Sequence, residues 1–262
     1  MEALTPVISI KNLHKAYDSV MVLKNINLDF YAGQITGYIG PNGAGKSTTL
    51  KILIGLLDNF EGDVSVLGLD VKTNSMEIKK RIGYVPENAL LYEVLTPLEY
   101  LLFIGRLYQI DDAVIERRAT ELLTILGLKD VINSRMNTFS KGMKQKVLLV
   151  SGLIHNPEII FLDEPLSGLD ANAVILVKDI LARLKEAGKT IIYSSHIMDV
   201  VEKLSDRIII INKGEVVADG TFTELKENAS SGSLESIFGS LTGGNQEGQT
   251  LSNEFISALS SF

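Results

Sequence analysis

The 262-residue sequence contains no cysteine and only three histidines, at positions 14, 155 and 196. Without cysteine there is no disulfide framework, no thiolate zinc site and no cysteine nucleophile, and the chain suits a reducing compartment. Three widely separated histidines are also too few for a histidine-rich metal cluster. Chemistry based on thiols or on clustered imidazoles is therefore excluded.

Long apolar runs are missing as well. A membrane-spanning helix needs roughly 18–20 consecutive apolar residues. The best candidate runs, 98–107 and 147–154, are shorter, and the first contains Glu99 and Arg106. The N-terminus lacks a basic region followed by an apolar stretch, so we expect no signal peptide. These features predict a cytoplasmic chain, which lies on the inner face of the cell membrane only if a partner holds it there.

An excess of positive charge is also lacking, because the net charge is −7. Proteins that bind the phosphate backbone of nucleic acids are usually basic, so we expect no nucleic-acid partner. Hydrophobic residues make up 45% and charged residues 22% of the chain, as in ordinary globular proteins, which excludes disorder of the whole chain. The length predicts one large domain or two small ones.

Strand-like and helix-like segments alternate along the chain. Short apolar segments typical of strands lie at 7–10, 21–28, 34–39, 64–66, 81–85, 159–162, 190–193 and 207–211. Helical periodicity is found in the segments 47–57, 97–126 and 172–187. Since 97–126 carries no strand signal, the pattern predicts an α/β sheet with a helical subdomain inserted into it.

The C-terminal part has a different composition. Residues 226–250 are rich in Ser, Gly, Asn and Gln, which is typical of a linker or a loose tail. Beyond it, apolar residues recur at helical spacing and predict a short amphipathic helix: Leu251, Phe255, Ile256, Leu259 and Phe262. Such a helix can dock on its own domain, fray, or contact a partner or a second copy, and the sequence leaves these alternatives open.

A glycine-rich segment follows the strand-like 34–39 and opens the helical 47–57. It reads Gly40-Pro41-Asn42-Gly43-Ala44-Gly45-Lys46-Ser47 and matches the phosphate-binding motif G-x-x-x-x-G-K-S/T at every fixed position. Glycines let the backbone wrap round phosphates with its N–H groups pointing inward, and the start of a helix adds a favourable dipole. Lys46 suits the β- and γ-phosphates, and the Ser47 hydroxyl suits Mg²⁺. Together with Thr48, these residues are the predicted phosphate-binding set.

Two carboxylates follow the strand-like segment 159–162. Asp163 is placed to hold Mg²⁺, directly or through water, and Glu164 to polarise an attacking water as a general base. His196 follows the strand-like 190–193. A lone histidine is often structural, but ligands of such sheets bind outside the carboxyl ends of the strands, which favours a γ-phosphate contact. Lys46, Glu164 and His196 are therefore the predicted catalytic residues.

One further segment has two interpretations. Asn212-Lys213-Gly214-Glu215 follows a strand-like run and resembles the guanine-reading N-K-x-D of GTPases, but its glutamate is one methylene too long. The segment also lies between two apolar runs, and Asn with Gly is typical of a hairpin turn. We favour the hairpin.

The segment between the phosphate-binding motif and the two carboxylates indicates the class of protein. It reads Phe139-Ser140-Lys141-Gly142-Met143-Lys144-Gln145-Lys146 and resembles the L-S-G-G-Q signature of ABC-type ATPases. Tyr17 stands where an aromatic residue of that family stacks on adenine, 83–87 looks like the Q-loop, and 167–170 looks like the D-loop. His196 looks like the switch histidine. The resemblance covers about residues 6–225.

The resemblance implies an α/β fold, with a P-loop NTPase (RecA-like) core sheet, an N-terminal antiparallel β-subdomain and an inserted α-helical subdomain. It implies an ATP-binding core of residues 1–87 and 156–225, a helical signature subdomain of 88–155 and a C-terminal tail of 226–262 that carries the short amphipathic helix. ATP and Mg²⁺ are the implied cofactors. Ser47, Asp163 and Glu87 are the implied metal ligands.

Subunits of this family pack head to tail, so the resemblance implies a second ATPase subunit, in a homodimer or a heterodimer. Ser140 and the amides near Gly142, at the start of the predicted helix 141–153, would contact the γ-phosphate held by the other subunit. Ser140 can also be an N-cap, and the two roles are compatible. The form F-S-K-G-M, Val-Pro-Glu at 85–87 and the segment 233–238 look like ATPase subunits of ABC-2-type exporters, which implies transmembrane permease subunits as partners.

The sequence departs from the family pattern at three positions. Lys141 replaces the first signature glycine and brings positive charge near the phosphates, and Met143 replaces the polar glutamine. Glu87 replaces the usual glutamine of the Q-loop, and it either contacts Mg²⁺ or faces solvent or a permease residue. The apolar residues within 88–105, Leu90, Leu91, Tyr92 and Leu95 among them, either receive a permease helix or pack within the helical subdomain.

Three functions are compatible with these features. The first is an ATP-binding and hydrolysing subunit of a membrane exporter, which drives transport through a separate permease by nucleotide-dependent dimerisation. The second is an ABC protein acting on nucleic acid or ribosomes, against which the single cassette, the lack of a heptad arm and the acidic charge argue. The third is an ABC-type ATPase with a regulatory or non-transport role at a membrane partner, which the sequence does not separate from the first.

Overall fold

The computed structural model of the protein describes residues 5–87, 91–229, 232–243 and 255–259. A six-stranded sheet has the order β10-β9-β3-β8-β7-β6, and a four-stranded sheet has the order β2-β1-β4-β5. The strands of the larger sheet are β3 (Ile35–Ile39), β6 (Ile82–Val85), β7 (Ile159–Asp163), β8 (Thr190–Ser194), β9 (Arg207–Asn212) and β10 (Glu215–Gly220). Those of the smaller sheet are β1 (Ile8–Tyr17), β2 (Val20–Phe30), β4 (Glu61–Val66) and β5 (Leu69–Asp70).

The larger sheet is parallel except at one edge. β3 pairs in parallel with β8 and β9, and β7 pairs in parallel with β6 and β8. Only β10 in this sheet pairs antiparallel, with β9, whereas the smaller sheet is antiparallel throughout. This arrangement confirms the predicted fold class, an α/β core sheet with an antiparallel β-subdomain and helices inserted between β6 and β7.

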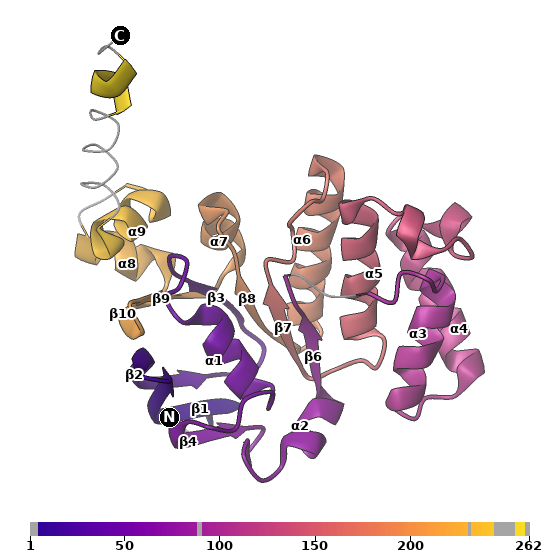
Figure 1. The fold of residues 1–262 in the computed structure, drawn as a ribbon, viewed down its shortest axis with the longest axis horizontal. Helices are drawn as coiled ribbons and strands as arrows, with labels where there is room; N and C mark the ends of the chain where they lie inside the picture. Colours follow the sequence, from indigo (N-terminus) through magenta and orange to yellow (C-terminus); the bar gives the residue numbers. More distant parts are fainter. Residues whose placement is uncertain (1–4, 88–90, 230–231, 244–254, 260–262) are drawn as a thin grey trace.

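Helices cover the sheets and extend the molecule at both ends (Figure 1). They are α1 (Lys46–Leu53), α2 (Ser75–Arg81), α3 (Pro97–Leu107), α4 (Asp112–Ile125), α5 (Lys141–Leu153), α6 (Ala171–Glu186), α7 (Met198–Leu204), α8 (Phe222–Ala229) and α9 (Leu234–Thr242). Two short 3-10 helices, Lys129–Val131 and Met136–Thr138, connect α4 to α5. In Figure 1, α3, α4 and α5 gather beyond the β6 edge of the core sheet, and α8 and α9 lie at the opposite end beside β9 and β10.

Strand β7 shows why both faces of the core sheet must be covered. Its five residues are all buried. Side chains alternate between the two faces of a strand, so Ile160 and Leu162 pack in one apolar cluster with residues of α4, α5 and α6, while Ile159 and Phe161 pack in the other cluster with residues of α1 and the smaller sheet. The carboxylates after Leu162 are thereby held at the end of a rigid strand.

The predicted helical regions are confirmed with corrected ends. The region 97–126 forms two helices, because α3 ends at Leu107 and α4 starts anew after the N-cap Asp111. A capping box between Thr96 and Glu99, with Pro97 at the first helical position, begins α3. The segment 47–57 was predicted too long, since α1 ends at Leu53 and Gly55 adopts a positive φ of 66°. The short helix α2 was not predicted.

The segment 212–215 is a hairpin turn, as favoured from the sequence. Glu215 pairs with Asn212 across the antiparallel β9 and β10. Lys213 and Gly214 both have positive φ, 48° and 84°, as a tight two-residue hairpin requires. The segment therefore needs no guanine-reading function to explain its composition.

The interpretation of 226–250 as a linker or loose tail was wrong for much of that segment. Helices α8 and α9 occupy 222–229 and 234–242, with Leu225, Leu234 and Ile237 buried. Ser233 caps α9 by accepting a hydrogen bond from Ser236 N. Residues 255–259 are helical as predicted, and Phe255, Ile256 and Leu259 are exposed; Leu251 and Phe262 lie outside the described residues.

Among the residues that the structure describes, no helix is long and apolar enough to cross a membrane.

Candidate active site

The phosphate-binding motif forms the turn between β3 and α1. Gly43 and Gly45 have φ values of 77° and 110°, which side-chain-bearing residues rarely adopt. A Cβ atom at Gly40 would collide with Ile211 O of the neighbouring strand β9. The glycines are therefore required by the backbone conformation of this turn. The first N–H groups of a helix have no partner within the helix, so the start of α1 offers donors to a phosphate group.

Lys46 opens α1 and is only 8% exposed. Its Nζ donates hydrogen bonds to Gly40 O at 2.6 Å and Pro41 O at 3.1 Å, so the ammonium lies against the loop that it belongs to. Burial lowers the pKa of Lys46, and the nearby carboxylates, that of Glu164 first, oppose this shift. Phosphate oxygens bound in this loop would therefore lie close to the positive charge of the Lys46 ammonium.

Ser47 and Asp163 join the phosphate loop to the end of β7. Ser47 Oγ donates to Asp163 Oδ2 at 3.1 Å, and Ser194 Oγ at the end of β8 donates to Asp163 Oδ1. Asp163 is 6% exposed, so these hydrogen bonds fix a nearly buried carboxylate. The hydroxyl and the carboxylate together offer hard oxygen ligands at one point.

These oxygen atoms fit Mg²⁺. Within the described residues no three His, Cys, Asp or Glu side chains converge on one point as a complete metal site. An ion held by Ser47 and Asp163, with Glu87 on the same pocket wall, would thus need further oxygen ligands from phosphates or water, which is how Mg²⁺ commonly binds.

Glu164 and His196 follow the adjacent strands β7 and β8. Glu164 Oε1 lies 3.3 Å from His196 Nε2, and His196 N donates to Glu164 Oε2 at 3.3 Å. The contact of Oε1 lacks the alignment of a hydrogen bond, so this buried oxygen has no hydrogen-bond partner in the described part of the chain. Burial raises the pKa of the Glu164 carboxyl, and His196 opposes that shift. An unsatisfied carboxylate oxygen with a raised pKa is suited to accept a proton from water.

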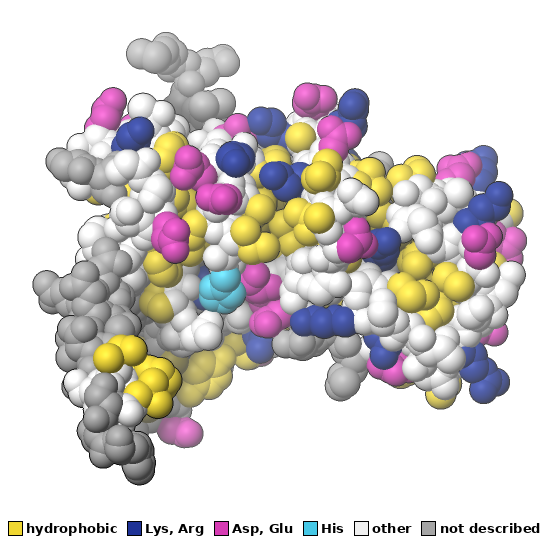
Figure 2. Space-filling model, turned by 90° about the horizontal axis from the view of Figure 1, so that it is seen from above, with side chains coloured by type: hydrophobic (Ala, Val, Ile, Leu, Met, Phe, Trp, Pro, Cys, Tyr) yellow, Lys and Arg dark blue, Asp and Glu magenta, His cyan; other side chains and the backbone are white. Residues whose placement is uncertain are grey.

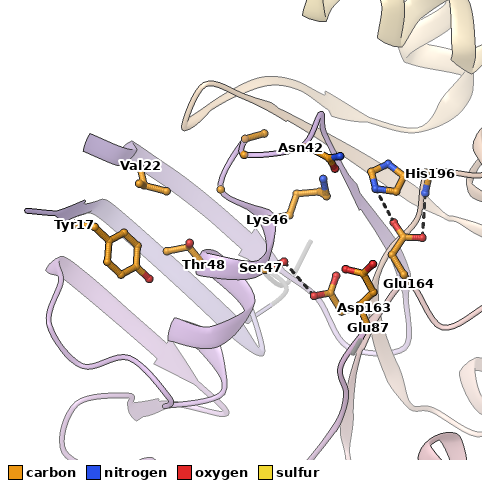
Figure 3. Close-up of a pocket in the computed structure, with 13 residues that line it drawn as sticks. Tyr17, Val22, Asn42, Lys46, Ser47, Thr48, Glu87, Asp163, Glu164 and His196 are labelled. Atoms are coloured by element: carbon orange, nitrogen blue, oxygen red, sulfur yellow. Dashed lines mark hydrogen bonds and ion pairs between the residues drawn. The ribbon is translucent and has the colours of Figure 1, made fainter. Parts of the chain in front are cut away.

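These groups line one cavity of about 350 Å³ (Figure 3). Its walls are Tyr17, Val22, Asn42, Gly43, Ala44, Gly45, Lys46, Ser47, Thr48, Glu87, Asp163, Glu164 and His196. Figure 3 shows Tyr17 and Val22 at one end, Lys46 in the middle, and the carboxylates with His196 at the other end. The cavity thus offers an aromatic surface, a phosphate loop and a hydrolytic end in sequence.

Most of the residues selected from the sequence meet in this cavity. Gly40 and Pro41 lie beside it and hold Lys46 through their carbonyl groups. Ser140 and Gly142 do not line it, because they stand at the start of α5. Ser140 is an N-cap there, accepting a hydrogen bond from Met143 N at 3.2 Å.

Two residues of the site were missed. Val22 lines the cavity on the same side as Tyr17, and it stands in the unbroken apolar run 20–23, so no alternation in the sequence set it apart. Ser194 orients Asp163, which depends on the pairing of Asp163 with Ser194 between β7 and β8. Such a register is a property of the assembled sheet, and the local sequence carried no sign of it.

Comparison with known proteins identifies the class. The family described as "ABC transporter" matches residues 23–167. The linearmycin resistance ATP-binding protein LnrL of Bacillus subtilis is 38% identical over 82% of this chain and 69% of its own length. NatA of the same species, an ABC transporter ATP-binding protein, is 38% identical over 84% of this chain and 89% of its own length. The Nod factor export ATP-binding protein I of Cupriavidus pinatubonensis is 33% identical over 83% of this chain and 67% of its own length.

Solved structures agree with this grouping. An ATP-binding subunit of an ABC transporter superimposes with a TM-score of 0.84 at 32% identity, covering 90% of this chain and 99% of its own. A dimeric cassette in a post-hydrolysis state, bound to ADP and Pi, gives a TM-score of 0.77 at 29% identity over 82% of this chain and 98% of its own. The chain therefore belongs to the ATP-binding proteins of the ABC transporter family. It is an ABC-type ATPase with relatives of the exporter type.

Proposed function

We propose that this chain hydrolyses ATP to drive a membrane exporter whose permease is formed by separate chains. The observation that carries the proposal is the single cavity in which Lys46, Ser47 and Asp163 face Glu164 and His196. In this proposal residues 1–87 and 156–225 form the ATP-binding core, 88–155 the helical subdomain and 226–262 the C-terminal segment.

Each group has a defined task in hydrolysis. Tyr17 stacks on adenine, the loop amides and Lys46 hold the phosphates, and His196 contacts the γ-phosphate. Glu164 accepts the proton of the attacking water on its carboxylate, whose pKa is raised by burial. Ser47, Asp163 and Glu87 would hold Mg²⁺, which would neutralise part of the phosphate charge. The hydrogen bonds around Asp163 keep its carboxylate fixed during the reaction.

The proposal includes a second ATPase subunit, as a homodimer or a heterodimer. Ser140 is exposed at the N-terminus of α5 and lies outside its own chain's cavity. A helix start with free N–H groups attracts phosphate, so Ser140 and the amides near Gly142 are suited to the nucleotide of another copy. One of the similar structures is a dimeric cassette bound to ADP and Pi, which supports a second subunit.

A permease contact is proposed at the segment that leads from Glu87 into α3. Tyr92, Val94 and Phe103 are 59%, 68% and 42% exposed, and the rings of Tyr92 and Phe103 meet edge to face at 5.9 Å. Leu91 is buried and Leu95 is partly buried in the core cluster, so those two residues pack inward, and Leu90 lies outside the described residues. The exposed aromatic pair is suited to an apolar partner at the inner face of the cell membrane.

Nucleic acid is not a proposed partner. On the face drawn in Figure 2, lysine and arginine side chains are interspersed with acidic ones, and no single basic patch is seen there. The net charge of −7 agrees with this distribution.

Purification of the native complex tests the exporter proposal. It predicts that a polytopic permease co-purifies with the chain, and that a transported compound stimulates ATP hydrolysis by the complex. A stable membrane partner that moves no compound across a vesicle membrane, although ATP is hydrolysed, would favour the regulatory alternative.

A further inference from the structure

The loop after β7 is tied to α5 by a buried glutamine. Gln145 is only 3% exposed, and its Nε2 donates to Pro165 O at 3.2 Å. Pro165 is itself buried and directly follows Glu164. A buried carbonyl that loses its donor is costly to leave unpaired, so this hydrogen bond constrains where the loop can lie.

Two further residues of α5, Lys141 and Gly142, contact the same loop. Lys141 Nζ donates to Ser167 Oγ at 2.8 Å, and the Lys141 stem lies across Gly168. A Cβ atom at Gly142 would lie 2.6 Å from Gly168 O, so the helix start and the loop touch backbone to backbone. The loop leads into α6, and Figure 1 shows α5 and α6 side by side. The first turns of α5 and the loop 164–170 therefore form one unit.

This loop holds Glu164 in an unusual conformation. Glu164 has a φ of 49°, in the left-handed region that non-glycine residues rarely occupy. Its N–H donates to Ser194 Oγ and O, both at 3.3 Å, and its carbonyl accepts from Ser167 N at 3.1 Å. A strained residue persists only where its surroundings over-determine it. The hydrogen bond from Gln145 to the carbonyl of the following residue, Pro165, adds a further constraint on the backbone of Glu164.

We propose that Gln145 is a positioning residue that keeps Glu164 in this conformation and its carboxylate beside His196. The inference rests on the proposed function, in which Glu164 is the general base. Without the Gln145 donor the Pro165 carbonyl turns to find another partner, the loop relaxes, and Glu164 leaves the left-handed region. The carboxylate then points away from the water that it must activate.

In this proposal α5 serves two active sites, one in its own subunit and one in the second subunit. Ser140 at its start is proposed to reach the nucleotide of a second subunit, and Gln145, little more than one turn later, holds the base of its own subunit. A shift of this helix on binding the second nucleotide would therefore move Glu164.

Gln145→Leu tests the inference, because leucine keeps most of the side-chain volume and lacks the donor. The expected result is a fall in kcat of about 10- to 100-fold, since small misplacements of a catalytic group have effects of this size, with KM for ATP within about twofold of wild type. Arg118→Leu is the matched control. It removes a hydrogen bond of the same kind, from Arg118 Nη1 to Ile154 O at the other end of α5, and should leave kcat unchanged.

A second readout separates positioning from a general loss of structure. In a chain that already carries Glu164→Gln, adding Gln145→Leu should not lower the residual rate further, because the group being positioned is gone. A further fall of more than about threefold in that background would contradict the proposal. So would a kcat of Gln145→Leu within twofold of wild type.

If Gln145→Leu does not fold, as judged by circular dichroism, variants of the hydrogen-bonded pair Lys141 and Ser167 provide the test. Lys141→Met and Ser167→Ala should each lower kcat, and the double variant should be no slower than the slower single variant. Wild-type rates in both would overturn the inference. A wild-type chain that fails to hydrolyse ATP would instead overturn the proposed function, whereas normal wild-type hydrolysis with an unaffected Gln145→Leu overturns only the positioning role.

Discussion

Glu164 and His196 approach to 3.3 Å at the ends of two neighbouring parallel strands, 32 residues apart in the sequence. The parallel pairing of β7 with β8 brings them together, since Asp163 is opposite Ser194 in the register. The histidine supplies both its ring and its backbone N–H to the same carboxylate. This relationship links the proposed base to the residue proposed to contact the γ-phosphate.

The raised pKa of Glu164 predicts the acidic limb of the pH profile. A general base acts when ionised, so kcat/KM should fall as the pH drops through a pKa above the usual glutamate range. His196 holds that pKa down, and removal of its ring in His196→Ala should move the limb of the residual activity to higher pH. His14→Ala, which does not line the cavity, is the control. An unchanged or downward-shifted limb in His196→Ala would contradict the assignment.

The role of Ser140 in a second subunit's site predicts complementation. Lys46→Ala removes the phosphate contact, and Ser140→Arg blocks the helix start by its bulk. In a mixed dimer both lesions can fall in one composite site and leave the other intact. The mixture should then regain part of the ATPase activity that each variant lacks alone. Failure to recover activity when mixed dimers are demonstrated counts against composite sites.

Glu87 predicts a specific change in Mg²⁺ dependence. A carboxylate is a stronger oxygen ligand for Mg²⁺ than the amide that the family usually has there, so Glu87→Gln should raise the Mg²⁺ concentration that gives half-maximal ATPase activity. Metal-free nucleotide binding should change less, because the charge next to the phosphates only becomes favourable with the ion present. Titration of activity against Mg²⁺ at fixed ATP measures this. Superimposable curves would remove Glu87 from the metal ligands.

The packed C-terminal helix predicts a stability effect. Ile237 is 1% exposed, so Ile237→Ala should lower the free energy of unfolding by about 2–5 kcal/mol, as measured by urea denaturation. Leu241→Ala, at a position that is 36% exposed, should cost clearly less. If the segment were a loose tail, the two variants would unfold at the same urea concentration as the wild type.

The sequence was sufficient to predict those parts of the site that depend on fixed residue types at fixed spacing. The turn between β3 and α1 could be predicted at every motif position, because glycine adopts the positive φ of Gly43 and Gly45 far more readily than other residues and because Lys46 opens the helix. The position of Asp163 could be predicted as well, since an apolar run that ends in carboxylates is typical of a buried strand, and β7 is buried throughout. These are local rules.

The sequence was insufficient to predict features of the structure that depend on contacts between distant segments. Leu234 and Ile237 stand among Ser and Gly residues, and their burial comes from packing against α7, α8 and β9 rather than from local composition. The hold of Gln145 on Pro165 and the left-handed backbone of Glu164 likewise arise only when α5 meets the loop after β7. Neither could be derived from periodicity or motif spacing.

The most direct test of the account is the steady-state ATPase rate of Glu164→Gln, measured together with ATP binding. Removal of the general base should lower kcat by a factor of about 10²–10⁴ while ATP binding is retained. The variant should also accumulate an ATP-bound dimer, seen as a shift to larger size on gel filtration. A rate close to that of the wild type would contradict the assignment of Glu164 and with it the proposed mechanism.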